Sequence, residues 1–182
     1  EAIRLPGTGR GPTWAVFDPP WYRRRYAQAI QDLDPGDDAG LLQYYLTTGQ
    51  RLGHSPNPWF DETWYRQRYP GVRDALAAGH IASGLDHYCR GNMLDRAPHW
   101  LFDERRYRAR NPDLTDDVLR EHRLANGYDH YLRNGDKAGR PSHVFFDASV
   151  FLAGLDATAA EAARAGGPYQ YYLRHLGAFT TD

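Results

Sequence analysis

The stretch "FDETWYRQRYPGV", from Phe60 to Val72, places four aromatic residues, two acids and a proline in thirteen positions. Near-copies of this stretch begin at three other phenylalanines, as "FDPPWYRRRY" at Phe17, "FDERRYRARNP" at Phe102 and "FDASVFLAGL" at Phe146. The aspartates after these phenylalanines are spaced by 43, 42 and 44 residues, and they are Asp18, Asp61, Asp103 and Asp147. Self-similarity at a fixed period of this length is typical of a repeat protein.

A second motif recurs at the same period. It reads "LLQYYLTTG" from Leu41, "GLDHYCRG" from Gly84, "GYDHYLRNG" from Gly127 and "GPYQYYLRHLG" from Gly167. A short connector that contains proline or histidine then leads to the next phenylalanine. We therefore expect repeats at 17–59, 60–101, 102–145 and 146–182, with residues 1–16 as the tail of a preceding connector. The fourth repeat has lost the Trp-Tyr pair and is expected to be a degenerate, capping unit.

The recurring residues predict short helices. An Asp directly before a helical run is a strong N-cap, because its carboxylate accepts the free N–H groups of the first turn. The phenylalanine before each cap and the aromatic residue five positions after it resemble a hydrophobic staple. Pro70 and Pro112 are expected to end the first helix or to begin the next one. Further helices are expected to end at four glycines, namely Gly79, Gly91, Gly127 and Gly135.

The predicted fold class is therefore all-α, with about three short helices in each unit of roughly 43 residues. No strand-like alternation of apolar and polar residues is present. A unit of this size cannot bury enough apolar surface alone, so we expect the units to stack around a continuous aromatic and leucine core.

Composition excludes several classes of function. The formal net charge of -1 gives no global field for nucleic acid or an anionic membrane. The 21 Arg residues outnumber the single Lys137, a bias that anion recognition or a GC-rich coding sequence would equally produce. The single Cys89 cannot form an internal disulfide and is expected to be a small buried residue. No apolar run is long enough for a membrane span. The start "EAIRLPGTGR" lacks Met and a signal peptide, which suggests a piece of a longer array.

The motifs "FDETWYRQRYPGV", "GLDHYCRG" and "GRPSHVFFD" together resemble a family of repeats found in bacterial proteins of surface-polysaccharide biosynthesis. In that family the repeats commonly lie beside glycosyltransferase domains. The resemblance covers the chain from Phe17 onward. It implies an accessory, non-catalytic region of a larger glycan enzyme, located in the bacterial cytoplasm, and it supplies no catalytic residues to carry over.

Candidate catalytic and metal sites each have a simpler structural explanation. Four capping acids in four repeats are not the single pair of carboxylates that glycoside hydrolysis requires. His87 and His130 share a slot in which the other repeats have tyrosine, so we expect a hydrogen-bonding position there rather than a metal site or a general base. The acidic segment 32–40 is expected to be a turn followed by an N-cap, not a calcium loop. "GTGRG" lacks the Lys-Ser/Thr of a phosphate loop. We therefore expect neither a metal nor a cofactor.

Candidate ligand-binding residues lie where the repeats differ. The slot three residues after each capping acid holds Trp21, Trp64, Arg106 and Val150 in the four repeats. Exposed indole or guanidinium planes at this slot could stack on a sugar face, and Trp59 and Trp100 in the connectors could extend the same surface. The alternative is that these residues pack between repeats.

Three functions remain open from the sequence. The first is glycan binding. The second is a scaffold for self-association or for protein partners, among them another part of the parent enzyme. The third and least supported is an independent enzyme, because no acid, base and nucleophile can be assembled within one repeat.

Overall fold

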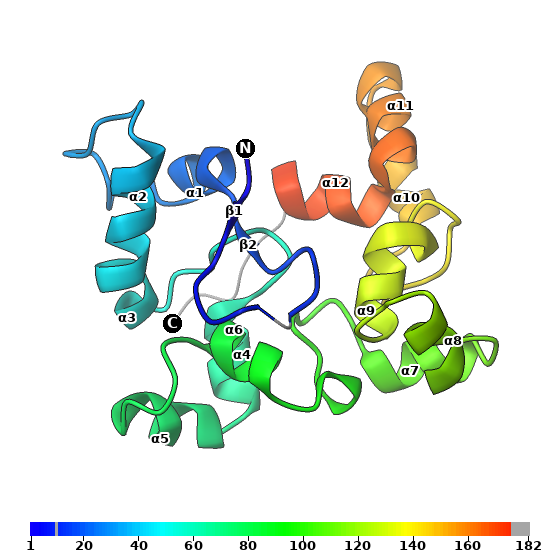
Figure 1. Cartoon of the computed structure of the whole chain (residues 1–182). Coiled ribbons are helices and arrows are strands. Elements are labelled where there is room, and N and C mark those ends of the chain that lie inside the picture. Colours follow the sequence, from blue (N-terminus) through cyan, green and yellow to red (C-terminus); the bar gives the residue numbers. More distant parts are fainter. Residues whose placement is uncertain (10, 176–182) are drawn as a thin grey trace. The chain divides into compact units, whose positions relative to one another are not determined.

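A computed structural model describes residues 1–9 and 11–175 of the chain, and these residues are mostly helical (Figure 1). The chain divides into two compact units. Residues up to Gly91 form the N-terminal unit, and the described residues from Asn92 onward form the C-terminal unit. The all-α prediction is confirmed, apart from one small strand pair described below.

The N-terminal unit contains seven helical segments and two short strands within its described residues. The strands β1 (Ile3–Arg4) and β2 (Val16–Phe17) pair antiparallel, a feature that the sequence did not predict. The segments η1 (Tyr45–Gly49) and α3 (Gln50–Leu52) continue the helix α2 (Asp38–Tyr44) through a π-helical turn. The remaining helices are α1 (Pro19–Arg25), α4 (Glu62–Arg68), α5 (Gly71–Ala77) and α6 (Gly84–Arg90).

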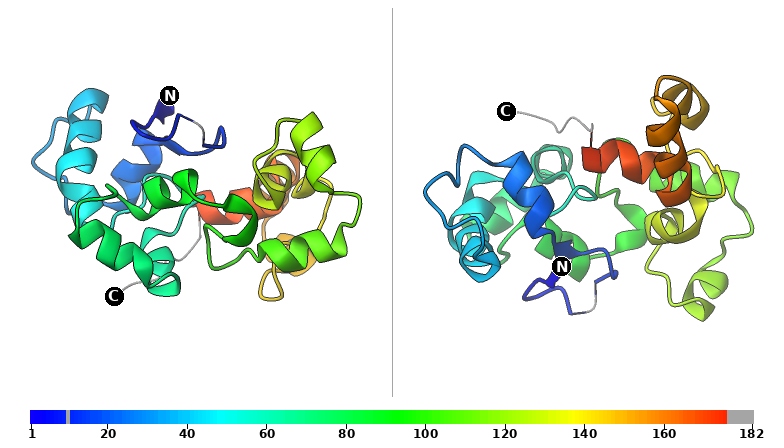
Figure 2. Two further views of the ribbon diagram at one scale, coloured as in Figure 1. Left: turned by 60° about the horizontal axis from the view of Figure 1, so that its bottom comes forward. Right: turned by 90° about the horizontal axis from the view of Figure 1, so that it is seen from above.

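The C-terminal unit begins with a 3-10 turn, η2 (Met93–Asp95). Its described residues form further helices and connecting loops but no strand of two or more residues. The helix α9 (Gly127–His130) continues into the π-helical turn η3 (Tyr131–Gly135). The other helices are α7 (Glu104–Arg110), α8 (Asp116–Glu121), α10 (Ala148–Ala153), α11 (Ala157–Gly166) and α12 (Pro168–His175). The last three pack against one another, and the right-hand view of Figure 2 shows α11 and α12 meeting.

The four recurring aspartates are N-caps. Each carboxylate accepts the backbone N–H three residues later, at 3.0 Å for Asp18, 3.1 Å for Asp61, 2.9 Å for Asp103 and 3.0 Å for Asp147. These bonds satisfy one of the free amides at the start of α1, α4, α7 and α10. The leading helix of each predicted repeat therefore follows an aspartate that makes the same capping hydrogen bond.

Aromatic staples fix how the chain enters these helices. The ring centroids of Phe17 and Tyr22 lie 5.0 Å apart, and those of Phe60 and Tyr65 also lie 5.0 Å apart. The corresponding separation is 5.2 Å in the third repeat and 5.7 Å in the fourth. Aromatic pairs at these separations contribute packing energy beyond their burial. In both units the core is thus built around the phenylalanine before the cap.

Buried carboxylates connect separate helices, a role that the sequence did not reveal. Glu62, on α4, accepts the amide of Gly84 at 2.6 Å and that of Leu85 at 3.3 Å, at the start of α6. Glu104, on α7, accepts the amides of Gly127 and Tyr128, at the start of α9, at 2.6 and 3.0 Å. Each carboxylate therefore caps a helix that lies 22 to 24 residues further along the chain.

The fourth predicted repeat uses a different acid for the same purpose. Asp136 accepts the amides of Tyr169 and Gln170, near the start of α12, at 3.0 Å each. Burial raises the pKa of Asp136, although the bonds from these two amides favour its ionised form. A buried carboxylate is thus matched to the positive end of a helix in each of these three places.

A tyrosine and a histidine meet inside each of the first three predicted repeats. The Tyr65 hydroxyl lies 3.0 Å from His87 Nδ1, and the Tyr107 hydroxyl lies 2.9 Å from His130 Nδ1. This is the hydrogen-bonding role expected of the His87 and His130 slot. In the first repeat Tyr44 occupies that slot, and the connector residue His54 takes over the contact, with its Nδ1 2.6 Å from the Tyr22 hydroxyl.

The predicted helix ends need correction at one of the four glycines, Gly127. Gly79 does follow α5 with a left-handed φ of 70°. Gly127 instead begins α9, because its amide is held by Glu104, and α8 ends before Arg123, which takes a φ of 54°. Gly135 is the last residue of η3 and Gly91 is the C-cap of α6, so both helical runs end as expected, but neither glycine has a left-handed φ. The glycines of the second motif are therefore not left-handed C-caps.

Position 135 requires a glycine, because the Tyr107 hydroxyl occupies the space that a Cβ would fill. A Cβ at this position would clash with that hydroxyl and would lie 3.0 Å from Tyr131 Cδ2. We expect Gly135→Ala to lower the free energy of unfolding by about 1–2 kcal/mol, since overpacking outweighs the gain in helix propensity. Urea unfolding of the full chain would measure this.

The matched control is Gly166→Ala in α11, where a Cβ meets nothing within 4 Å. It should leave the stability unchanged or raise it. Because Tyr107→Phe removes the clashing oxygen, Gly135→Ala should cost less in the Tyr107→Phe background. An equal cost in both backgrounds would contradict this account of the glycine.

Candidate ligand-binding site

Two adjoining hollows lie on the C-terminal unit. The first, which we call the aromatic groove, has a volume of about 290 Å³ and is lined by Trp100, Leu101, Phe145, Val150, Phe151 and Tyr172. The second, which we call the basic cavity, has a volume of about 790 Å³ and is lined in part by Arg106, Arg110, Lys137, Arg140 and Arg164. Phe146 and Asp147 line both hollows. The two volumes match the range of about 300–1,000 Å³ that is usual for small-ligand sites.

A tight turn in the connector presents Phe145 to solvent. The amide of Phe145 donates to His143 Nδ1 at 3.3 Å, and the amide of Phe146 donates to the His143 carbonyl oxygen at 3.3 Å. This turn directs Phe146 into the core, where it is 8% exposed, and leaves Phe145 76% exposed. The connector thus places two consecutive phenylalanines on opposite sides of the backbone.

The same kind of turn occurs in the other connectors. His99 Nδ1 accepts the amide of Leu101 at 3.1 Å, and Asn57 Oδ1 accepts the amide of Trp59 at 2.9 Å. In those connectors the residue before the phenylalanine is buried, since Leu101 is 1% and Trp59 is 8% exposed. Phe145 therefore occupies a position that is covered elsewhere in the chain.

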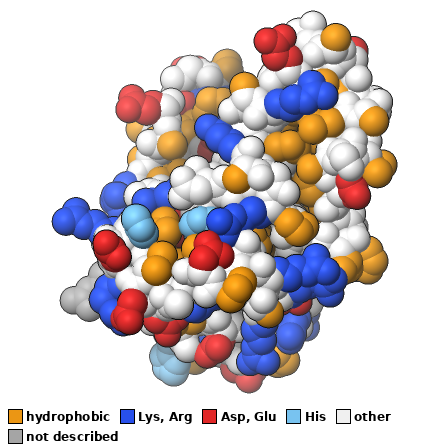
Figure 3. Space-filling model, turned by 90° about the vertical axis from the view of Figure 1, so that its right-hand side faces the viewer, with side chains coloured by type: hydrophobic (Ala, Val, Ile, Leu, Met, Phe, Trp, Pro, Cys, Tyr) orange, Lys and Arg blue, Asp and Glu red, His pale blue; other side chains and the backbone are white. Residues whose placement is uncertain are grey.

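Further apolar side chains extend the groove outward. Val150, in the first turn of α10, is 70% exposed, and Val144 beside Phe145 is 55% exposed. Figure 3 shows that, on this side of the molecule, Lys and Arg side chains lie directly beside hydrophobic ones. A contiguous exposed apolar patch of this kind usually marks a binding surface rather than inert exterior.

The basic cavity has more positive than negative side chains. Of its five cations, only Arg140 has an internal partner among the described residues, with Asn111 at 2.7 Å and Asp113 at 3.2 Å. The cavity's two carboxylates are already engaged. Asp136 holds the start of α12, and Asp147 accepts from the Ser149 amide and hydroxyl, bonds that lower the pKa of Asp147.

His143, which also lines the basic cavity, does not add to its charge. Burial lowers the pKa of His143, and the nearby Arg106 lowers it further, while Asp103 opposes them. The imidazole is therefore neutral at pH 7, with Nδ1 held by the Phe145 amide. The role of His143 is to accept the Phe145 amide and so to close the connector turn.

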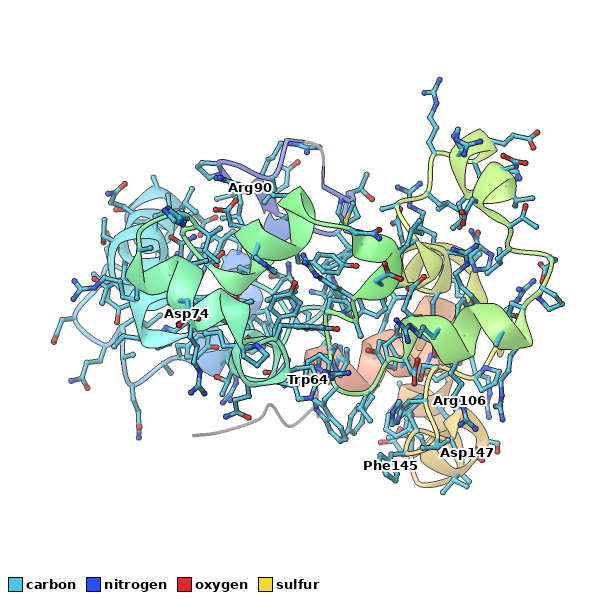
Figure 4. All side chains as sticks on the ribbon, turned by 90° about the horizontal axis from the view of Figure 1, so that it is seen from below. Trp64, Asp74, Arg90, Arg106, Phe145 and Asp147 are labelled. Atoms are coloured by element: carbon cyan, nitrogen blue, oxygen red, sulfur yellow. The ribbon has the colours of Figure 1, made fainter. Side chains whose placement is uncertain are left out.

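The structure brings together two of the five predicted ligand residues. Trp100 lines the aromatic groove and Arg106 lines the basic cavity. Figure 4 shows Arg106, Phe145 and Asp147 near one another at one edge of the C-terminal unit, contributed by α7 and by the connector that leads into α10. Both hollows consist of residues from this unit alone.

The prediction for Trp21 and Trp59 is corrected. Trp21 is only 3% exposed and Trp59 only 8%, because both indoles pack into the core of the N-terminal unit. Neither can present a face to a sugar. Trp64 is half-buried in the same unit and packs edge-on against Tyr69, with ring centroids 6.3 Å apart.

Several residues of the site were not predicted. Arg110 and Phe145 lie within recurring motifs but were not singled out, and Lys137 and Arg164 belong to no motif. The four residues lie on separate segments, namely α7, the connector, the turn after η3 and α11. The only available signal was the consecutive pair Phe145-Phe146, where the sister connectors have Trp59-Phe60 and Leu101-Phe102. That comparison shows a difference between connectors but not which of them is exposed.

The other candidate chemistries find no site among the described residues. No group of three or more His, Cys, Asp or Glu side chains within residues 1–9 and 11–175 could hold a metal ion. In the acidic segment, Asp34 accepts the Gly36 amide at 2.8 Å and Asp37 caps α2.

Cys89 is buried, which raises the pKa of its thiol to about 12. No described helix has the length and apolar character needed to cross a membrane.

Comparison with known proteins adds no assignment. No protein-family model matches this chain, and no curated protein or solved structure matches it significantly. The functional conclusion therefore depends on the geometry of the aromatic groove and the basic cavity.

Proposed function

We propose that this chain is a non-catalytic helical repeat region of a larger bacterial protein of surface-polysaccharide biosynthesis, and that its C-terminal unit binds a glycan. The observation that carries the proposal is the aromatic groove, with the exposed Phe145 beside Trp100, lying next to a cavity with five cations. The resemblance of the "FDETWYRQRYPGV" and "GLDHYCRG" motifs to glycosyltransferase-associated repeats supports the same conclusion.

The repeat arrangement is part of this proposal. Its support is the recurrence of the same contacts at equivalent positions: an Asp N-cap, an aromatic staple, a buried carboxylate that caps a later helix, and a connector turn closed by Asn or His. We propose that the four predicted repeats are variants of one folding unit, and that their differences, not their shared positions, create the binding surface.

The groove suits a pyranose ring for a physical reason. One face of such a ring exposes mainly C–H groups, which pack well on flat aromatic side chains, while its hydroxyl groups need hydrogen-bond partners. The indole of Trp100 and the ring of Phe145 supply the apolar surface. The cations of the adjoining cavity supply donors for hydroxyl oxygens.

Two features favour binding over catalysis. The carboxylates in the basic cavity, Asp136 and Asp147, are committed to backbone amides rather than facing each other as an acid and a nucleophile. The histidine in the cavity, His143, is held by its own turn. Glycoside hydrolysis would require a pair of free carboxylates on opposite sides of the substrate.

Tryptophan fluorescence provides the first test. The panel of oligosaccharides comprises maltohexaose, cellohexaose and hexagalacturonate. We expect Phe145→Ala to weaken binding of the full chain to the best of them by about two- to tenfold, since one aromatic contact contributes roughly 0.5–1.5 kcal/mol. Trp100→Ala, followed by calorimetry because a fluorophore is lost, should have a similar effect. The control is Leu52→Ala, which removes a 60% exposed side chain from the N-terminal unit and should bind normally.

A scaffold role is the second candidate, because the exposed Val144, Phe145 and Val150 would also suit a protein surface. Sedimentation velocity of the full chain distinguishes the two. A monomer that binds one glycan of the panel supports the first proposal. A dimer that Phe145→Ala dissociates, with no glycan bound, would replace it with self-association.

A further inference from the structure

We infer that the glycan bound by the C-terminal unit is anionic, with a carboxylate or phosphate group held in the basic cavity while a neighbouring sugar ring packs in the aromatic groove. This inference rests on the proposed function and adds the chemical class of the ligand. The two hollows share Phe146 and Asp147 as lining residues, so one oligosaccharide can extend from one to the other.

The charge of the cavity is the main argument. Four of its cations make no ion pair among the described residues, namely Arg106, Arg110, Lys137 and Arg164. By contrast, Arg108, Arg120 and Arg133 of the same unit each pair with an aspartate. The chain as a whole has a formal charge of -1, so this concentration of positive charge is local. Unpaired cations gathered in a hollow raise the local concentration of an anionic ligand.

The positions of Arg106 and Arg110 favour a planar or tetrahedral anion. They lie four residues apart on α7, which places both side chains on one face of the helix. A guanidinium group can donate two parallel hydrogen bonds to a carboxylate or a phosphate, and such charge-assisted bonds are the strong ones. Both residues are exposed, and among the described residues neither side chain has an ion pair that a ligand would have to displace.

The carboxylates of the cavity offset only part of this attraction, since two carboxylates face five cations. Asp136 is 2% exposed, and its oxygens face the amides of Tyr169 and Gln170. Asp147 is exposed and stays ionised, because its bonds to Ser149 and Val150 lower its pKa. It lies between the two hollows, where it can accept hydrogen bonds from sugar hydroxyl groups.

The test compares hexagalacturonate with its methyl ester, which keeps the sugar rings and removes the charges. By calorimetry on the full chain, wild type should bind the acid form about tenfold or more tightly than the ester, and added salt should reduce the difference. The double variant Arg106→Gln/Arg110→Gln should lose this preference. The control Arg105→Gln, on the same helix but outside the cavity lining, should keep it.

The outcomes separate this inference from the proposed function. Equal affinity for both forms, with binding still lost in Phe145→Ala, would overturn the anionic class and leave glycan binding intact. Binding of neither form, while a neutral glycan of the panel is bound, would overturn the anionic class alone, and binding of no glycan of the panel would overturn both. A preference that survives in the double variant would place the anion elsewhere and contradict the inference. Competition by glucose 1-phosphate and by glucuronate then distinguishes a phosphate from a carboxylate, since the stronger competitor identifies the group.

Discussion

Replacing Glu104 with alanine is expected to lower the free energy of unfolding of the C-terminal unit by about 3 kcal/mol, because two buried amides lose their acceptor. The Glu104 carboxylate, 3% exposed, accepts the amides of Gly127 and Tyr128 at 2.6 and 3.0 Å. Hydrogen exchange measured on the full chain tests this directly, since these two amides should lose most of their protection.

Two further variants make the result specific. Glu104→Gln keeps one acceptor oxygen and should cost less than Glu104→Ala. Glu121→Ala removes an exposed carboxylate at the end of α8 and should leave the protection unchanged. If Glu104→Ala and Glu121→Ala were equally stable, the buried carboxylate would not be what holds α9 to α7.

The second large effect is acid sensitivity caused by His99. Burial, with a smaller contribution from His143, lowers the pKa of His99 from its ordinary value of 6.5 to about 3. The unfolded chain therefore binds a proton below pH 6.5 while the folded chain does not, so the stabilisation present above pH 6.5 is lost as the pH falls. Between pH 7 and pH 4 this group alone should remove about 3 kcal/mol.

His99→Asn isolates that contribution. The equivalent connector uses Asn57, whose Oδ1 accepts the amide two residues later just as His99 Nδ1 does, so the variant keeps the turn. Urea unfolding at several pH values should show wild type losing stability relative to His99→Asn as the pH falls. Parallel curves for the two proteins would show that His99 is not the buried base described above.

The helix N-caps and the aromatic staples could be predicted from the sequence, because each depends on residues that lie close together in the chain. An aspartate three residues before an amide, and a phenylalanine five residues before an aromatic ring, are contacts within one helical turn or two. The hydrogen-bonding slot of His87 and His130 followed from a substitution pattern among the repeats.

The contacts between residues that are distant in the sequence could not be predicted in this way. Glu62 and Glu104 look like ordinary first-turn acids, and only the packing of α4 on α6 and of α7 on α9 turns them into caps of a second helix. That contact also explains why Gly127 begins a helix rather than ending one. The strand pair of β1 and β2 has two residues in each strand and so no periodicity to detect.

The site shows the same limit. For the slot of Trp21 and Trp64 the sequence left both an exposed ligand surface and packing between repeats open. Trp21 is buried, and the sequence of a helix does not show what packs over it. Arg106 and Trp100 were predicted as parts of one surface, and the folded connector supplies Phe146 and Asp147, which line both the cavity that contains Arg106 and the groove that contains Trp100.

The most direct measurement of the central claim is amide chemical-shift mapping of the full chain titrated with hexagalacturonate. The account predicts the largest shifts in the connector at 143–149, at Leu101 next to Trp100, and along α7 near Arg106 and Arg110. Shifts confined to the N-terminal unit, around Trp64 for example, would contradict it.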